Sequence, residues 1–192
     1  ESDSHTGLTH TTGVTFTPFV RWNFGASSDI GTLEDRETGA ETKRRAGTVR
    51  AGYGFDTVQL SSAVEYRFDD TQQTDGVWSD RTTWLFKNNV RYQTSPDWRV
   101  VGKFNHSDSD SSLGQFYDGG YTEAVVGYAY RPVNHDRLNT LAKYTYFYNV
   151  PSVDQLSGQE APVPSEFIQK SHIAALDVTY DLTPSWSVGG KY

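Results

Sequence analysis

Alternation of apolar and polar residues runs through most of this 192-residue chain and constrains its fold more than any other feature. Helical periodicity is hard to find, whereas segments of about ten residues rich in Tyr, Thr, Val and Phe are bounded by turn residues. In one such segment Val58, Leu60 and Val64 fall on one side, with polar neighbours between them. The pattern predicts nine strands, at 13–24, 44–55, 57–68, 81–93, 98–107, 120–132, 137–148, 167–180 and 185–192.

The connections between these segments alternate in length. The long ones are polar and cover residues 25–43, 69–80, 108–119 and 149–166, whereas the short ones lie at 56, 94–97, 133–136 and 182–185. A meander with short turns on one side and long loops on the other is typical of transmembrane barrels. The sequence therefore predicts an all-β fold, an antiparallel up-and-down transmembrane β-barrel over residues 13–192, preceded by an N-terminal segment 1–12.

Strand length favours a membrane over a soluble β-sandwich. Strands of about 11–12 residues span about 36–40 Å, or about 25–28 Å of height at a 45° tilt, whereas soluble strands average about 5–6 residues. Aromatic residues also gather on the apolar face beside the short turns, where rings with a polar edge would lie at headgroup level. We expect these membrane-interface aromatics to be Phe55, Tyr92, Trp98, Tyr130, Tyr180 and Trp186. Ordinary cross-strand aromatic packing is the alternative.

The charges are sorted by location. The chain has 17 Lys and Arg against 24 Asp and Glu, a net charge of −7, but most acids fall in the predicted long loops. The polar strand faces carry mainly bases. The candidate lumen-lining residues are Arg50, Glu65, Arg67, Arg81, Lys87, Arg91, Arg99, Lys103, Glu123, Arg131, Lys143, Asp177 and Lys191. They indicate either a water-filled, mildly basic lumen that favours anions or an interior filled by charges that pair across strands.

Several kinds of chemistry are excluded or unsupported. The chain has no Cys, which excludes a disulfide framework and a thiol nucleophile. No His pair has a metal-binding spacing, and Ser171 and His172, as neighbours in a strand, point to opposite faces. We find no catalytic constellation and expect a non-enzymatic protein without cofactor or metal. An acidic chain with one short basic cluster is also a poor nucleic-acid binder.

Two stretches, RPVNHDRLNTLAKYTYFYNVP (131–151) and EFIQKSHIAALDVTYDLTPSWSVGGKY (166–192), resemble the barrel region of large bacterial outer-membrane proteins of the porin and TonB-dependent-receptor type. The turns DLTPSW (181–186) and TSPDW (94–98) are similar to each other and to the hairpin turns of such barrels. The resemblance implies a Gram-negative outer-membrane location, with lipid and lipopolysaccharide as partners. No plug domain is present in this sequence, so the resemblance carries no energised uptake role.

The odd number of predicted strands, together with a last strand that reaches Tyr192, leads us to expect a fragment of a longer barrel. The expected function is that of a passive channel or transport barrel for small solutes or ions, with a mildly basic lumen and acidic external loops. A non-conducting structural or surface-display barrel is the alternative, and a soluble all-β binding module is the third possibility. The substrate and the oligomeric state stay open at this point.

Overall fold

The computed structural model describes residues 5–35, 39, 41–72, 76–114, 118–134, 137–150 and 169–192. These residues form one antiparallel sheet of ten strands in the order β1 to β10, so that every strand pairs with its neighbour in the chain. The strands are β1 (His5–Phe16), β2 (Trp22–Asp35), β3 (Glu41–Gly54), β4 (Val58–Gln72), β5 (Trp78–Gln93), β6 (Trp98–Ser111), β7 (Gly119–Tyr130), β8 (Leu138–Val150), β9 (Gln169–Thr183) and β10 (Trp186–Lys191). The predicted all-β, antiparallel up-and-down fold is confirmed.

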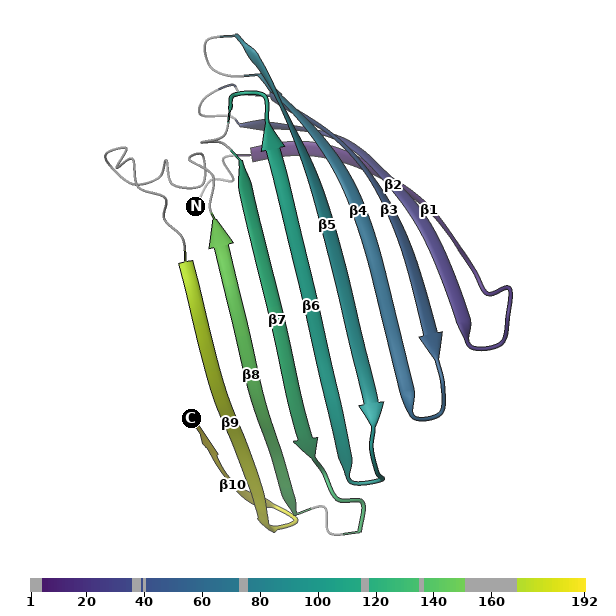
Figure 1. The fold of residues 1–192 in the computed structure, drawn as a ribbon, viewed down its shortest axis with the longest axis vertical. Coiled ribbons are helices and arrows are strands. Elements are labelled where there is room, and N and C mark those ends of the chain that lie inside the picture. The colour runs from purple at the N-terminus through teal and green to yellow at the C-terminus, as the bar shows by residue number, and fades with distance from the viewer. Residues whose placement is uncertain are drawn as a thin grey trace.

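The sheet is curved and twisted and forms a trough in Figure 1. β1 and β10 each pair with one neighbour only, so the strands of the described residues do not close into a cylinder. This open sheet has the form of part of a barrel wall. Among the described residues, no helix has the length and apolar character needed to cross a membrane.

The predicted strand 13–24 is wrong, because it runs through a turn. Residues 17–21 join β1 to β2, the N–H of Trp22 donates to the Phe19 carbonyl at 3.2 Å, and Arg21 has a φ of +78°. Apart from Pro18 this turn lacks the usual turn residues, and Phe19 and Val20 extend the apolar pattern across it. The predicted N-terminal segment 1–12 is corrected with it, since residues 5–12 belong to β1.

The predicted long loops are corrected as well, because most of their described residues are paired strand. Residues 25–35 and 41–43 of the first predicted loop lie in β2 and β3, and Asp29 pairs with Ala46. β4 ends at Gln72, β5 begins at Trp78 and β6 ends at Ser111, all inside the predicted loops. Both faces become polar there, so the apolar pattern that marks a strand is lost although the hydrogen-bonded ladder continues. Most of the predicted loop 149–166 lies outside the described residues.

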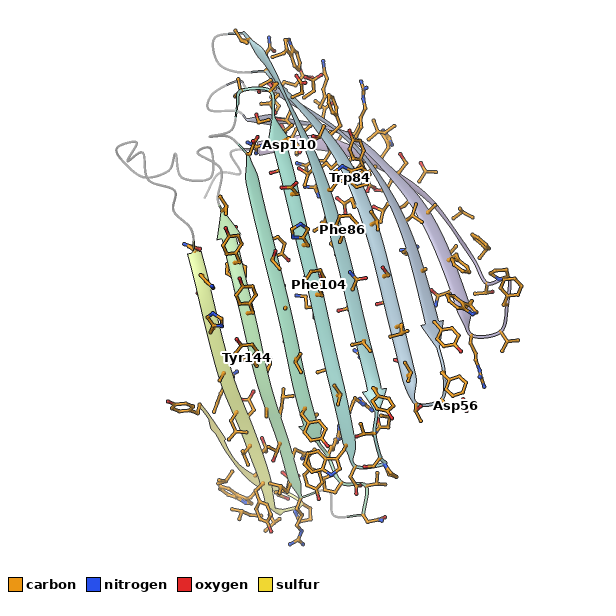
Figure 2. All side chains as sticks on the ribbon, in the orientation of Figure 1. Asp56, Trp84, Phe86, Phe104, Asp110 and Tyr144 are labelled. Carbon is orange, nitrogen blue, oxygen red and sulfur yellow. The ribbon has the colours of Figure 1, made fainter. Side chains whose placement is uncertain are left out.

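The two kinds of connection lie at opposite ends of the sheet. In Figure 2, Asp56 marks the end that carries the short turns, and Asp110 lies near the other end. Adjacent short turns are hydrogen-bonded to each other: the Asp97 carbonyl accepts from the N–H of Arg131 at 2.8 Å, and its carboxylate accepts from the N–H of Val133 at 2.8 Å. The short-turn end is therefore tied together beyond the ladder itself.

Candidate functional site

Strand register divides the side chains into an apolar face and a polar face. Residues directly opposite each other in an antiparallel pair point to the same side, and Val58, Tyr92, Val100 and Tyr128 are successive partners from β4 to β7. Their face carries most of the exposed large hydrophobic side chains, including Leu8, Val14, Phe16, Trp22, Ile30, Val49, Leu60, Tyr66, Trp84, Phe86, Tyr92, Trp98, Phe104, Val126, Tyr128, Tyr144, Leu176, Tyr180 and Val188. A soluble domain would bury such a face.

The polar face is the concave one. A hollow of about 870 Å³ is bordered mainly by side chains of this face from six successive strands, β2 to β7. They include Asn23 on β2, Gln59 on β4, Arg91 on β5 and Lys103 on β6. One hollow can touch strands that far apart only if the sheet curves toward it. We call the two sides the concave face and the convex face.

The convex face is itself divided along the strands. From the short turns up to Gly47 on β3, Phe68 on β4 and His106 on β6, the convex positions of β3 to β6 carry no Asp, Glu, Lys or Arg. Charges begin beyond that line, at Lys43, Arg45, Asp70, Asp80, Asp108 and Asp110. On β9 they begin at Lys170, which lies in register with His106. We call the uncharged part the convex belt and the strand ends beyond it the extensions.

The convex belt has the height of a membrane. On β6 it runs from Trp98 to His106 and on β4 from Val58 to Phe68, and about 9–11 residues of tilted strand cross a bilayer. Labelled side chains of the belt, among them Phe86, Phe104 and Tyr144, lie between the two ends of the sheet in Figure 2. The extensions lie beyond this belt, at the end of the sheet opposite the short turns.

The predicted interface aromatics lie at the short-turn end of the belt. Tyr92, Trp98, Tyr130 and Tyr180 occupy convex positions there, and the Trp98 ring lies 4.4 Å from that of Tyr130 and 4.5 Å from that of Tyr128. Their place at a lipid interface stays a prediction.

Phe55 lies in a turn with the Arg21 guanidinium 4.3 Å from its ring centroid. Trp186 begins β10 and is 74% exposed. Phe55 therefore lies outside the paired strands, whereas Trp186 pairs with Thr183 next to a register shift. Both stay at the short-turn end of the belt.

Sequence reasoning missed part of the aromatic arrangement. Trp22 and Tyr53 belong to the same end, with ring centroids 4.7 Å apart. At the opposite margin of the belt, Tyr66 and Trp84 pair across β4 and β5 with ring centroids 4.8 Å apart. The spacing along the sequence could have revealed this second margin, because Trp84 and Tyr92 lie on the same face of β5 and are separated by about the length of the belt.

The concave face carries more bases than acids. Of the predicted lumen-lining residues, all but Arg131 lie at concave positions of paired strands. The structure places Arg131 in the connection after β7, at the rim, because that strand ends at Tyr130. Sequence reasoning missed Arg44, Asp29, Asp69 and Asp181, which share this face.

Carboxylates on the concave face are held by bases. Glu65 accepts from Arg67 at 2.6 Å and lies 3.6 Å from the Lys87 ammonium. Glu123 lies 2.8 Å from the Lys103 ammonium and accepts from Asn105 at 3.1 Å. These clusters neutralise part of the positive charge.

A further pair lies in the extensions, where Arg44 and Asp69 are 2.7 Å apart. The hydrogen bond to Asp69 raises the pKa of Arg44 above its ordinary value. Lys191 and Asp177 are 3.8 Å apart at the β9–β10 edge. Glu65 and Arg67 lie two positions apart on β4, so strand periodicity alone puts them on one face. Each of the other pairs joins neighbouring strands, which only the register could reveal.

Four bases of the concave face keep their charge unpaired. In the part of the chain that the structure describes, Arg50, Arg91, Arg99 and Lys143 make no ion pair with a carboxylate. Arg91 also borders the hollow. Fixed, unpaired positive charges on a concave wall attract anions.

The predicted acidic loops are corrected in their location. Asp29 and Asp69 lie on the concave side of the extensions, and Asp70, Asp80 and Asp110 on the convex side. The acids Glu37, Asp75, Asp154, Glu160 and Glu166 lie outside the described residues. Among the described residues no group of three or more His, Asp or Glu is placed to hold a metal ion.

Comparison with solved structures places the fold among outer-membrane β-barrels. Two structures of in-vitro folded OmpT, an outer membrane protein of Vibrio cholerae, match with TM-scores of 0.59 at 13% identity. One match covers all of this chain and 61% of the OmpT chain. The other, to a trimer form, covers 97% of this chain and 56% of the OmpT chain. Outer-membrane expressed OmpT of Vibrio cholerae matches with a TM-score of 0.57 at 12% identity, over 79% of this chain and 53% of that one.

This chain thus spans between about half and three fifths of the length of the solved structures that it matches. No protein-family model and no curated protein sequence matches it. The fold is that of an outer-membrane β-barrel wall, as the sequence predicted.

Proposed function

We propose that this chain forms part of the wall of an outer-membrane β-barrel whose concave face lines an aqueous, anion-preferring pore. The observation that carries the proposal is the hollow of the concave face, bordered by Arg91 and Lys103, behind an apolar convex belt without charges. An outward apolar band and a polar interior are what a lipid-embedded, water-filled barrel requires.

Barrel size supports an open lumen over a filled one. Ten strands cover 61% of the length of one OmpT structure, which in proportion gives roughly 16 strands, and barrels of about 16–18 strands leave an aqueous channel. Barrels of about eight strands are instead filled by side chains. A lumen of the larger kind would leave the unpaired bases in water, free to attract anions.

The alternative is a barrel that anchors or displays other parts without conducting. The ion-paired clusters around Glu65 and Glu123 favour it, because charges that neutralise each other across strands can fill an interior. This alternative predicts no steady ionic current. The two functions differ in one measurement on the purified protein, its conductance in a planar lipid bilayer.

The bilayer experiment compares the wild type with two charge reversals. We expect steady current with a reversal potential shifted toward that of chloride in a potassium chloride gradient. The double variant Arg91→Glu, Lys143→Glu should abolish or reverse that shift, because both bases are unpaired on the concave face. The control Lys170→Glu makes one such charge reversal on the convex face and should leave the reversal potential unchanged.

Two results would contradict the proposal. Absence of any current from folded protein supports the anchoring barrel, and cation selectivity of the wild type excludes a basic lumen. The double variant must keep the far-UV circular dichroism of a β-barrel for its result to count.

A further inference from the structure

Arg50 lies flat against the concave wall at a position that a glycine makes possible. Thr15 on β1, Gly25 on β2 and Arg50 on β3 are successive register partners and point to the concave side. The Arg50 guanidinium donates to the Thr15 hydroxyl at 2.9 Å, so its side chain crosses the whole width of β2. It crosses directly over Gly25.

Gly25 has no side chain because the arginine occupies that space. A methyl group there would lie 3.0 Å from Cγ and 3.2 Å from Cδ of Arg50, and closer still to Nε. Carbon atoms in contact are normally about 3.5–4.0 Å apart. The clash would be with a flexible side chain and not with backbone, so a substitution would displace Arg50 while leaving the ladder intact.

The guanidinium held in this way keeps its charge and most of its donors. In the described part of the chain Arg50 makes no ion pair, and among side chains only that of Thr15 accepts a hydrogen bond from it. Its next register partner is the small Ala63, and beyond that lies Lys87. Arg50 also lies midway between Gly47 and Tyr53, which bound the belt on β3, and so near mid-height of the membrane.

We propose that Thr15 and Gly25 hold Arg50 as a fixed docking point for small oxyanions that pass along the concave wall. A planar guanidinium binds carboxylate or phosphate oxygens through paired N–H donors, which a halide cannot match. Holding the side chain in place beforehand removes the entropy cost of ordering it at each encounter. This inference rests on the proposed function, since it needs an aqueous pore.

The test is block of chloride current by inorganic phosphate in a planar bilayer. Phosphate should reduce chloride current through the wild type, and Arg50→Gln should weaken this block about tenfold or more, since a charge-assisted hydrogen bond contributes about 1.5–3 kcal/mol. Gly25→Ala and Thr15→Val keep every charge yet release the arginine, and we expect each to weaken the block about three- to tenfold.

The chain offers a matched control for the glycine. Asn23 and Gly52 are register partners on the same two strands, and a methyl group at Gly52 would lie 2.7 Å from Nδ2 and 2.8 Å from Cγ of Asn23. Gly52→Ala therefore makes the same change in the wall but displaces a neutral amide. It should leave phosphate block within about twofold of the wild type.

The outcomes separate this inference from the function on which it rests. Chloride current with no phosphate block, or an equal loss of block in Gly25→Ala and Gly52→Ala, overturns the docking site and leaves the pore standing. Unchanged block in Gly25→Ala does the same. Absence of chloride current from folded wild type overturns the pore and the docking site together.

Discussion

The convex belt and the extensions are parts of the same strands, with the same pleat and the same ladder, yet they differ in chemistry. In the belt the convex face is apolar and exposed, as at Val126 and Leu176. In the extensions the same face carries Asp70, Asp80 and Asp110. Secondary structure is the same in both regions, so the solvent outside the sheet decides which residues occupy the convex positions between the polar residues of the concave face.

The largest effect is expected when a charge is placed in each of the two regions. Val126→Arg puts a guanidinium at the centre of the belt on β7, and we expect it to lower the free energy of unfolding by about 2–4 kcal/mol. Val150→Arg makes the same substitution on the convex face of β8, at the level of Asp108, and should cost about 0–1 kcal/mol. Urea unfolding in lipid vesicles, followed by circular dichroism, measures both. Equal losses would contradict the boundary between belt and extensions.

A smaller difference is expected between two tryptophans. Trp98→Ala removes two ring contacts at the short-turn margin of the belt and should cost about 1–3 kcal/mol, since an aromatic pair contributes about 0.5–1.5 kcal/mol. Trp78→Ala in the extensions removes a contact with the Lys43 ammonium, 4.5 Å from the ring centroid, and should cost about 0.5–1 kcal/mol. The same unfolding assay compares them, and a larger loss at Trp78 would show that the aromatic margin was assigned to the wrong region.

The smallest effect concerns the ion pair of the extensions. Asp69→Asn breaks the contact with Arg44, in a pair whose side chains are 36% exposed for Arg44 and 14% exposed for Asp69, and should lower the unfolding free energy by about 0–1 kcal/mol. Because salt screens the exposed guanidinium, the loss should shrink between about 0.01 M and 1 M ionic strength. A loss that is independent of salt would mean that this pair lies in a dry environment like that of the belt.

Features that lie within one strand could be predicted from the sequence, whereas contacts between two strands could not. Strand 57–68 was predicted with its faces, since Val58, Leu60 and Val64 alternate with polar residues within one segment. The turn at 17–21 was missed because its apolar Phe19 and Val20 continued the pattern. The extensions were taken for loops because alternation of apolar and polar residues fades wherever both faces meet water.

Partners across strands could not be predicted from local pattern. Arg50 reaches Thr15, and Glu65 approaches Lys87, only because of the register between separate strands. Register shifts of one residue would reverse every face, so the contacts depend on where each turn begins.

The sequence by itself determined the all-β fold, the up-and-down order and the division into an apolar and a polar face, because a period of two is a property of one strand. Only the tertiary structure decided which face is concave, where the belt ends, which bases stay unpaired and why Gly25 has no side chain. Those features depend on the curvature of the sheet and on the register between strands, and both arise only when the strands are hydrogen-bonded side by side.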